Sequence, residues 1–170
     1  MIRRAREEDI PALTEIYNDA ILHTTATFDT EAKSLEDRRS WFAEHCGCYV
    51  IFVAEVDGTA VGYASLSRYR ERKAYERSAE LSVYVHRDWR GRGIGRALAE
   101  ETLAFAEARR ELGMVISQVT AENEASIRLH RQLGFSYCGQ LKRVGEKFGR
   151  LLDLNIYQKD CTKTESSDTR

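Results

Sequence analysis

Glycine and arginine alternate between residues 90 and 96, where an apolar, strand-like run gives way to apolar residues at helical spacing. The unpaired N–H groups and partial positive charge of a helix N-terminus favour an anion. Glycines there remove the Cβ atoms that would hold a ligand away, and arginines add mobile positive charge. The alternative is a glycine-rich turn with hydrated arginines. The stretch predicts a diphosphate site formed by Arg90, Gly91, Arg92, Gly93, Ile94, Gly95 and Arg96.

Glu80 is the candidate general base. In the predicted strand over 78–85, apolar residues alternate from Ala79 to Val85, which places Glu80 on the opposite face. If helices cover both faces, this carboxylate is partly desolvated and its pKa rises toward a value useful for general-base chemistry. The alternative is a solvated carboxylate on a half-exposed sheet.

The elements that must position these groups follow from spacing and turn signals. Asp57-Gly58 predicts a tight hairpin, Ser34 with Asp37 predicts a helix N-cap, and Gly134 predicts a helix end. The strands are expected over 1–5, 49–56, 60–69, 78–85, 114–120, 135–144 and 150–158, the last two joined by 145–149. The helices are expected over 11–22, 35–45, 93–110 and 122–133. The order predicts one α/β domain over 1–158, with a polar, disordered tail over 159–170.

Composition narrows the function classes. The chain has 170 residues, enough for one well-buried domain, and its net charge of −1 offers no general attraction to nucleic acid or an anionic membrane. No apolar run is long enough to span a bilayer, and the N-terminus turns acidic too early for a secretory signal. The four cysteines lack metal-ligand spacing. We therefore expect a cytoplasmic protein with free thiols and no metal.

The stretch from Arg90 to Gly95 resembles the Arg/Gln-x-x-Gly-x-Gly/Ala loop of GCN5-related N-acetyltransferases, which holds the pyrophosphate of acetyl-CoA. Residues 121–135 resemble the Asn-x-x-Ala/Ser-x-x-Leu-Tyr-x-x-x-Gly-Phe segment of the same family, and the element order resembles its fold over 1–158. The resemblance implies an α/β (α+β) acyl-CoA N-acyltransferase fold. It has a mixed, mostly antiparallel sheet of about seven strands flanked by four helices. Acetyl-CoA is the implied co-substrate.

Four segments, over 17–30, 71–85, 126–135 and 144–154, resemble the phosphinothricin and methionine sulfoximine acetyltransferase branch. The branch acetylates the α-amino group of small glutamate-like amino acids, including phosphinothricin, arsinothricin and methionine sulfoximine or sulfone, and so confers resistance to toxic ones. Its members are usually homodimers. The alternatives are acetylation of protein N-termini or polyamines, and a non-catalytic acyl-CoA sensor. A basic region before Glu80 disfavours polyamines, and a sensor would not need Glu80.

The resemblance implies roles for single residues. Glu80 would be the general base, directly or through water, although the branch's Thr-Val-Glu run is Ser78-Ala79-Glu80 here. The backbone around Tyr84, at Val83 and Val85, would pair with the pantetheine arm, and one N–H would polarise the thioester carbonyl.

His130 would protonate the leaving thiolate, and the alternative is a structural histidine bonded to Ser126 one helical turn earlier. Asn123 would bind the pantetheine amides, with Ser126 nearby, or else cap its helix; one side chain could not easily do both. Arg72 would recognise the acceptor's anionic group, unless it is one more hydrated charge in an arginine-rich loop. Four further candidates for the acceptor side are Tyr75, Phe28, Lys147 and Phe148.

Overall fold

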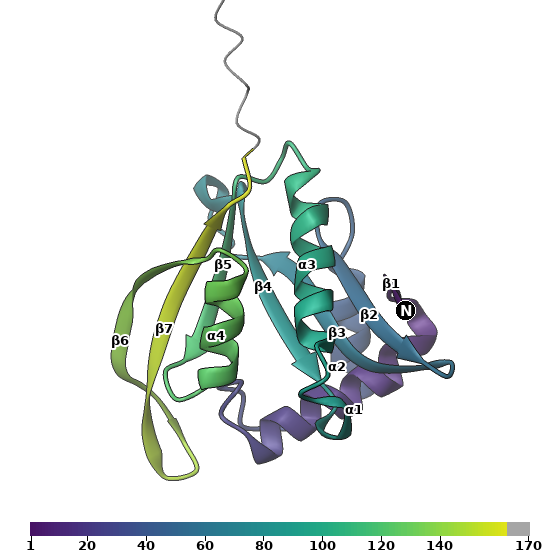
Figure 1. The fold of residues 1–170 in the computed structure, drawn as a ribbon. Coiled ribbons are helices and arrows are strands. Elements are labelled where there is room, and N and C mark those ends of the chain that lie inside the picture. Colours follow the sequence, from purple (N-terminus) through teal and green to yellow (C-terminus); the bar gives the residue numbers. More distant parts are fainter. Residues whose placement is uncertain (163–170) are drawn as a thin grey trace, which may run out of the picture.

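Seven strands form a single sheet in the order β1-β2-β3-β4-β5-β7-β6 in a computed structural model that describes residues 1–162 (Figure 1). The strands are β1 (Ile2–Arg4), β2 (Val50–Val56), β3 (Thr59–Arg68), β4 (Ser78–Val85), β5 (Met114–Thr120), β6 (Ser136–Lys147) and β7 (Arg150–Asp160). The helices are α1 (Ile10–His23), α2 (Leu35–Ala43), α3 (Ile94–Glu107) and α4 (Glu124–Gln132). Three 3₁₀ turns are η1 (Glu7–Asp9), η2 (Lys73–Tyr75) and η3 (Arg87–Trp89).

One pair of strands departs from the antiparallel pattern. β4 and β5 run parallel, whereas the other paired strands in the described chain are antiparallel. The parallel ladder joins Ser78–Glu80 to Met114–Ile116, and beyond it the two strands diverge (Figure 1). The expected mixed, mostly antiparallel sheet is confirmed, and the divergence leaves an open edge along the rest of β4.

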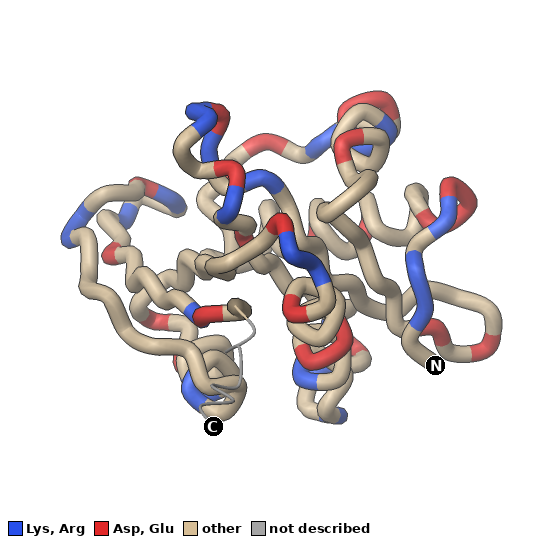
Figure 2. Tube along the Cα trace, turned by 90° about the horizontal axis from the view of Figure 1, so that it is seen from above, with Lys and Arg blue, Asp and Glu red and all other residues tan. Residues whose placement is uncertain are grey.

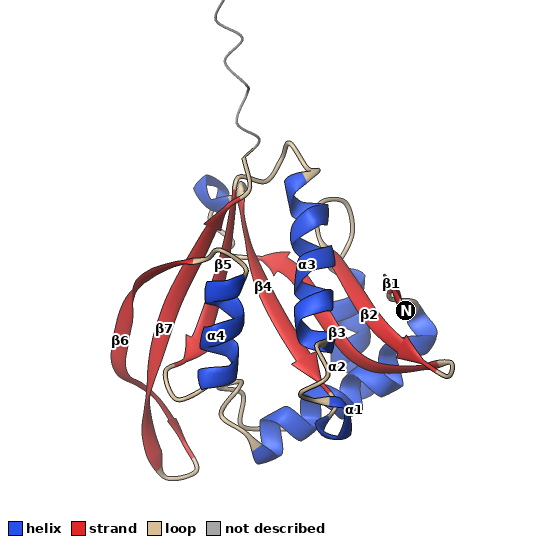
Figure 3. Cartoon of the chain, in the orientation of Figure 1, coloured by secondary structure: helices blue, strands red, loops and turns tan. Residues whose placement is uncertain are grey.

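Helices cover both faces of the sheet (Figure 3). On one face, Leu98 and Leu103 of α3 are buried in a core with Leu81 of β4, and α4 packs against the same core. On the other, Leu13 and Ile16 of α1 form a second core with strands β2 and β3, flanked by α2. Both cores are made by alternate residues of the same strands, since side chains on a strand point to opposite faces in turn.

The turn signals in the sequence are confirmed. Asp57 and Gly58 close the β2–β3 hairpin, both with positive φ, which is the twist that a two-residue turn needs. The Ser34 side chain accepts a hydrogen bond from the Asp37 N–H, and the Asp37 carboxylate accepts one in return. Gly134 follows α4 with a φ of +81°.

The end of the chain differs from the sequence expectation in two places. The segment over 145–149 is not a loop: β6 runs to Lys147, and only Phe148-Gly149 forms the turn, because Gly145 pairs with Leu152 across the hairpin. Strand β7 extends to Asp160, beyond the expected boundary at 158, because its last residues pair with the start of β5. The rest of the expected tail, over 163–170, lies outside the described residues.

Charge is spread along the chain rather than gathered: basic and acidic segments alternate along the outer loops in Figure 2. Across residues 1–162, no helix combines the length and apolar character needed to cross a membrane. The same residues contain no cluster of three or more His, Cys, Asp or Glu arranged to hold a metal ion. The four cysteines are free thiols.

Candidate active site

A cavity of about 530 Å³ occupies the gap where β4 and β5 diverge, and we call it the wedge cavity. It is bounded by the end of β4, the glycine-rich loop, the start of α4 and one side of α1. Its lining includes Val83, Tyr84, Val85, Arg90, Gly91, Gly93, Ile94, Gly95, Asn123 and Ser126. The structure therefore brings together most of the residues predicted to hold the cofactor, from three separate segments.

The mouth of α3 presents free backbone donors to this cavity. Gly93 is the N-cap, with a φ of +78°, and Gly91 has a φ of +73°, conformations that favour glycine. The first α-helical bond runs from the Ala97 N–H to the Gly93 carbonyl, so the four preceding N–H groups have no partner within residues 1–162. A Cβ built at Gly91 or Gly93 would meet nothing within 4 Å. The residues present therefore fit an anion that approaches the backbone.

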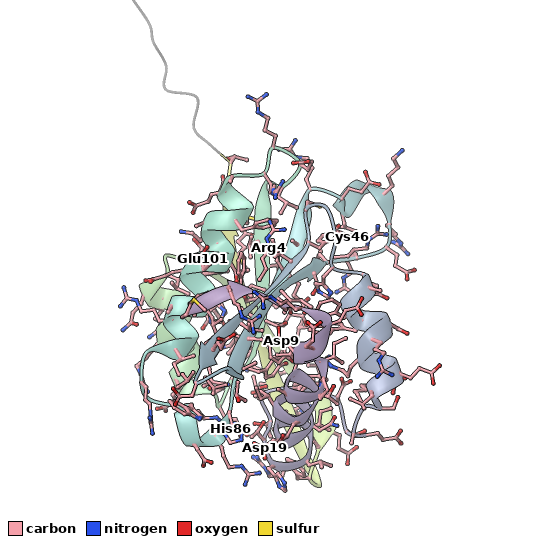
Figure 4. The ribbon with its side chains drawn as sticks, turned by 90° about the vertical axis from the view of Figure 1, so that its right-hand side faces the viewer. Arg4, Asp9, Asp19, Cys46, His86 and Glu101 are labelled. Atoms are coloured by element: carbon pink, nitrogen blue, oxygen red, sulfur yellow. The ribbon has the colours of Figure 1, made fainter. Side chains whose placement is uncertain are left out.

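The arginines of the loop are largely held by protein partners. The Arg90 Nε donates to the Val85 carbonyl at 3.1 Å, and its Nη2 lies 3.7 Å from Asp19 of α1. Arg87 also pairs with Asp19, which lies at the same end of the molecule as His86 (Figure 4). These contacts tie the loop to α1.

Arg92 lies over the Trp89 ring, and Arg96 pairs with Glu100 at 2.8 Å. Of the four arginines between 87 and 96, only Arg90 lines the wedge cavity. The positive charge that the sequence predicts around the diphosphate site therefore lies mostly outside the lining of the wedge cavity.

The backbone of β4 faces the wedge cavity at alternate residues. The His86 N–H donates to Val61 of β3 at 2.8 Å, so even-numbered residues of β4 direct their backbone groups toward β3. Val83 and Val85 direct theirs to the opposite edge, where the Arg90 Nε meets the Val85 carbonyl. Since β5 has diverged there, this edge is free to pair with an extended ligand.

A second cavity, of about 400 Å³, lies on the α1/α2 face of the same strands, and we call it the polar cavity. Its lining consists of Tyr17, Asp29, Lys33, Asp37, Arg38, Trp41, Tyr63, Ser65, Ser67, Glu80, Ser82 and Tyr84. Tyr84 lines both cavities, so the two sites share a wall at β4.

Glu80 lies in the polar cavity, on the face predicted for it. Burial raises the pKa of its carboxyl above the ordinary value, while the charge of Arg70 and a hydrogen bond from the Gln118 amide at 3.2 Å lower it. The net direction is upward, as the strand pattern led us to expect. A carboxylate in this state accepts a proton more readily than one in water.

Arg38 is the residue that sequence reasoning missed. Its side chain is only 5% exposed, lies over the Trp41 ring at 3.7 Å and donates from Nη2 to the Tyr63 hydroxyl at 3.1 Å. The available signal was its spacing of three residues from Trp41 on one helix face, which predicts a side-chain contact. The contact with Tyr63 spans 25 residues, which no local pattern reveals.

His130 is buried and lines neither cavity. Its Nδ1 donates to the Ser126 carbonyl at 2.7 Å, its ring stacks on Tyr157, and Nε2 is buried without a partner in the described chain. Burial lowers the pKa of the imidazole, which favours the neutral ring with its proton on Nδ1. The bond to Ser126 is the one that the structural interpretation expects, and the acid role stays a prediction.

Asn123 does cap α4: its Oδ1 accepts from the Ser126 N–H at 3.2 Å. The cap uses only the oxygen, and Asn123 also lines the wedge cavity. Its Nδ2 donors are thus available for a ligand, so capping and ligand binding are compatible after all.

The five residues predicted for the acceptor side line neither cavity. Arg72 is exposed at the start of η2, and the Tyr75 ring packs on Tyr69. Lys147 is buried and donates to the Thr27 carbonyl at 2.8 Å.

The Phe28 ring packs so closely on Gly145 that a Cβ there would lie 2.5 Å away. Phe148 is an exposed turn residue with a φ of +52°. Phe28 and Lys147 thus join the loop after α1 to the β6–β7 hairpin, and the acceptor role of all five stays a prediction.

Comparison with known proteins is consistent with this geometry. A model of the acetyltransferase (GNAT) family matches residues 10–135. An L-methionine sulfoximine/L-methionine sulfone acetyltransferase of Salmonella typhimurium is 40% identical over 159 residues, covering 92% of each chain.

Two solved structures share the fold along nearly the whole chain. A phosphinothricin acetyltransferase from Sinorhizobium meliloti, in complex with acetyl-CoA, has a TM-score of 0.92 at 33% identity, covering 100% of this chain and 91% of that one. A ribosomal-protein-alanine N-acetyltransferase from Brucella melitensis has a TM-score of 0.90 at 45% identity, covering 94% and 99%.

Proposed function

Since this chain belongs to the acetyltransferase (GNAT) family, in its phosphinothricin and methionine sulfoximine acetyltransferase branch, we propose that it acetylates the α-amino group of a small glutamate-like amino acid. Acetyl-CoA is the donor, as in the homologous complex. Acetylation of phosphinothricin, arsinothricin or methionine sulfoximine or sulfone would give resistance to these compounds.

One observation carries the proposal: Tyr84 of β4 is a wall of both cavities. On one side of it lie the free amides of the α3 mouth and the open backbone edge of β4. On the other side lies Glu80, a carboxyl with a raised pKa in a polar cavity of about 400 Å³. A thioester held along β4 would lie next to Tyr84, and an acceptor amine beside Glu80 would approach it from the other side of Tyr84.

The roles proposed for the chain's own groups follow from this arrangement. The amides of Gly93 and Gly95 bind the diphosphate, and Asn123 donates from Nδ2 to the pantetheine arm. Bound acetyl-CoA supplies an activated acyl group as a thioester.

Glu80 takes a proton from the acceptor ammonium, directly or through water, which frees the nitrogen lone pair to attack the thioester carbonyl carbon. A backbone N–H of Val83 or Val85 stabilises the oxyanion that forms as the C–N bond is made. The C–S bond then breaks as the acetylated nitrogen loses its second proton, and the departing thiolate takes up one proton, with His130 as the proposed donor. Binding both substrates before transfer avoids an acetyl-enzyme.

Two other functions compete with this one. The similarity to a ribosomal-protein-alanine N-acetyltransferase favours a protein N-terminus as the second candidate acceptor. A non-catalytic acyl-CoA sensor would need the α3 mouth but not a base in the polar cavity.

A panel assay that follows release of the CoA thiol separates the candidates. We expect turnover with phosphinothricin, methionine sulfoximine and methionine sulfone, and much less with an alanine-initiated peptide or a polyamine. Turnover confined to the peptide would replace the amino-acid acceptor, and acetyl-CoA binding with no acceptor turned over would support the sensor. The assay also ranks the amino acids as acceptors.

We also propose a homodimer. Strands β6 and β7 carry large exposed apolar side chains, among them Tyr137, Val144 and Leu151. A surface of this kind commonly marks an interaction site. Light scattering should give the mass of two chains, and a Leu151→Lys variant should lower it.

A further inference from the structure

We propose that Arg38 of α2 is the receptor for an oxyanion of the acceptor, a carboxylate or phosphinate held in the polar cavity. The inference rests on the proposed function and adds to it the group that binds the acidic part of the substrate.

The charge of Arg38 is buried without a counter-ion. The residue is 5% exposed, and within residues 1–162 its side chain forms no ion pair and a single hydrogen bond, to the Tyr63 hydroxyl. Its Nε is buried and unpartnered. Because a guanidinium has five N–H donors, most of its donor capacity is unused. A buried charge in this state is costly unless another group compensates it.

The rings of Trp41 and Tyr17 hold the guanidinium in place and accept no hydrogen bond from it. The Arg38 Cζ lies 3.7 Å from the centroid of the Trp41 ring and 4.6 Å from that of Tyr17. Cation–π contacts of this kind stabilise the charge and fix its plane. The planar fork is therefore set in one orientation, which suits a carboxylate or phosphinate.

The carboxylates around the cavity are engaged elsewhere. Asp29 accepts from the Tyr17 hydroxyl and lies 3.7 Å from the Lys33 ammonium. Asp37 accepts from the Ser34 backbone N–H in the cap of α2. Neither forms an ion pair with Arg38, so an anion from outside the chain can serve as its partner.

Arg38 and Glu80 line the same cavity but meet the paired strands β3 and β4 at different rungs. Tyr63, the partner of Arg38, is opposite Tyr84, whereas Glu80 is opposite Ser67. These two rungs are four residues apart, roughly 13 Å at about 3.3 Å per residue. The cavity thus offers both a cation and a base, the two groups that would bind a small molecule carrying an oxyanion and an amine.

The test compares Arg38→Met with Arg39→Met, the same change at the exposed neighbour on the same helix. We expect Arg38→Met to raise the acceptor KM by roughly 10- to 100-fold, the loss expected for a charged hydrogen bond. The Kd for acetyl-CoA should change less than about twofold, and Arg39→Met should resemble wild type. An unchanged acceptor KM in Arg38→Met overturns the proposal.

Three acceptors distinguish which oxyanion is bound: phosphinothricin, its α-carboxamide, and methionine sulfone, whose side chain is uncharged. The penalty of Arg38→Met should vanish for the carboxamide if Arg38 binds the α-carboxylate, and for the sulfone if it binds the side-chain phosphinate. An equal penalty for all three means that Arg38 only supports the fold, and the proposal fails.

Two further measurements cover the remaining outcomes. If Arg38→Met does not fold, nitrogen NMR of the arginine side chains in the wild-type protein replaces the kinetic test. The signal of the buried Arg38 Nε–H is assigned by its loss in Arg38→Lys. If that variant also fails to fold, the signal is assigned by its contacts to Trp41. That signal should shift when phosphinothricin is added and not when CoA is added; no shift overturns the proposal. Absence of wild-type turnover on the amino-acid panel would instead refute the proposed function.

Discussion

The side-chain amide of Gln118 on β5 donates a hydrogen bond of 3.2 Å to the Glu80 carboxylate on β4. Gln118 lies two residues beyond Ile116, the last β5 residue in the parallel ladder, so this bond crosses the point where the strands begin to separate. It favours the ionised carboxylate, as does the charge of Arg70, whereas burial disfavours it. The readiness of Glu80 to accept a proton is therefore set by a balance that single substitutions can shift.

Gln118→Leu should raise the pKa of Glu80 further, because it removes one of the two groups that favour the charged form. The acidic limb of the kcat/KM profile against pH should move to higher pH. Gln132→Leu, the same change at an exposed position of α4, serves as the control. If the limb stays in place, or moves equally in both variants, the group that titrates in it is not Glu80.

Glu80→Gln should lower kcat/KM by about 10²- to 10⁴-fold, the usual contribution of a positioned general base. The amide keeps the shape of the side chain, so acetyl-CoA binding, measured by titration calorimetry, should be retained. The acidic limb of the pH profile should disappear together with most of the activity. Full turnover in this variant would remove Glu80 from the mechanism.

Local chemistry in the sequence was enough to predict most of the fold. Asp57-Gly58 needs only its own backbone preferences to form a turn, and the alternation around Glu80 needs only the two-residue period of a strand. The side of the sheet on which Glu80 lies, and the upward direction of its pKa, followed from that period together with helices on both faces.

What the sequence did not predict depends on contacts between distant segments. Arg38 was assigned no role from the sequence, and only the fold brings it onto Tyr63 of β3. The β6–β7 connection was expected over 145–149, whereas Gly145 lies in β6 and its missing Cβ makes room for the Phe28 ring. Such pairings are set by tertiary packing, which no local window contains.

Gly95→Ala tests whether a ligand lies close to the backbone at the α3 mouth. A Cβ at Gly95 would lie 3.6 Å from Val85 and 3.7 Å from Val83, ordinary contact distances, so the protein itself tolerates the methyl group. Unfolding by urea should show unchanged or slightly higher stability, since alanine is favoured in helices by up to about 1 kcal/mol. Acetyl-CoA affinity should nevertheless fall by at least about tenfold, if the diphosphate approaches here. Unchanged affinity would place the diphosphate elsewhere.

Asn123 allows its two proposed roles to be separated. Asn123→Asp keeps the oxygen that caps α4 and removes the Nδ2 donors, so stability should hold while acetyl-CoA binds more weakly. Asn123→Ala removes both groups and should also lose about 1 kcal/mol of unfolding free energy. Tight acetyl-CoA binding in Asn123→Asp would show that Asn123 only caps α4. Because Asn123→Asp also adds a negative charge, Asn123→Ser serves as the neutral control.

His130→Phe decides between the structural and the acid interpretation of His130. Burial lowers the pKa of the folded imidazole below its ordinary value of 6.5, so the unfolded chain takes up a proton first as the pH falls. The stability associated with the neutral ring is therefore present above about pH 6.5 and is lost as the pH falls below it toward the folded-state pKa. His45, whose pKa is also lowered by burial, adds to the same decline.

In His130→Phe the fall in unfolding free energy between pH 7.5 and 5.5 should be shallower than in wild type, because one of these groups is gone. At pH 7.5 the variant should be less stable by about 1 kcal/mol, since it lacks the bond to the Ser126 carbonyl. If His130 is structural, kcat should stay within about threefold of wild type. A kcat lowered by about 10²-fold or more, with the stability profile of wild type, would show instead that this imidazole supplies the thiolate with its proton.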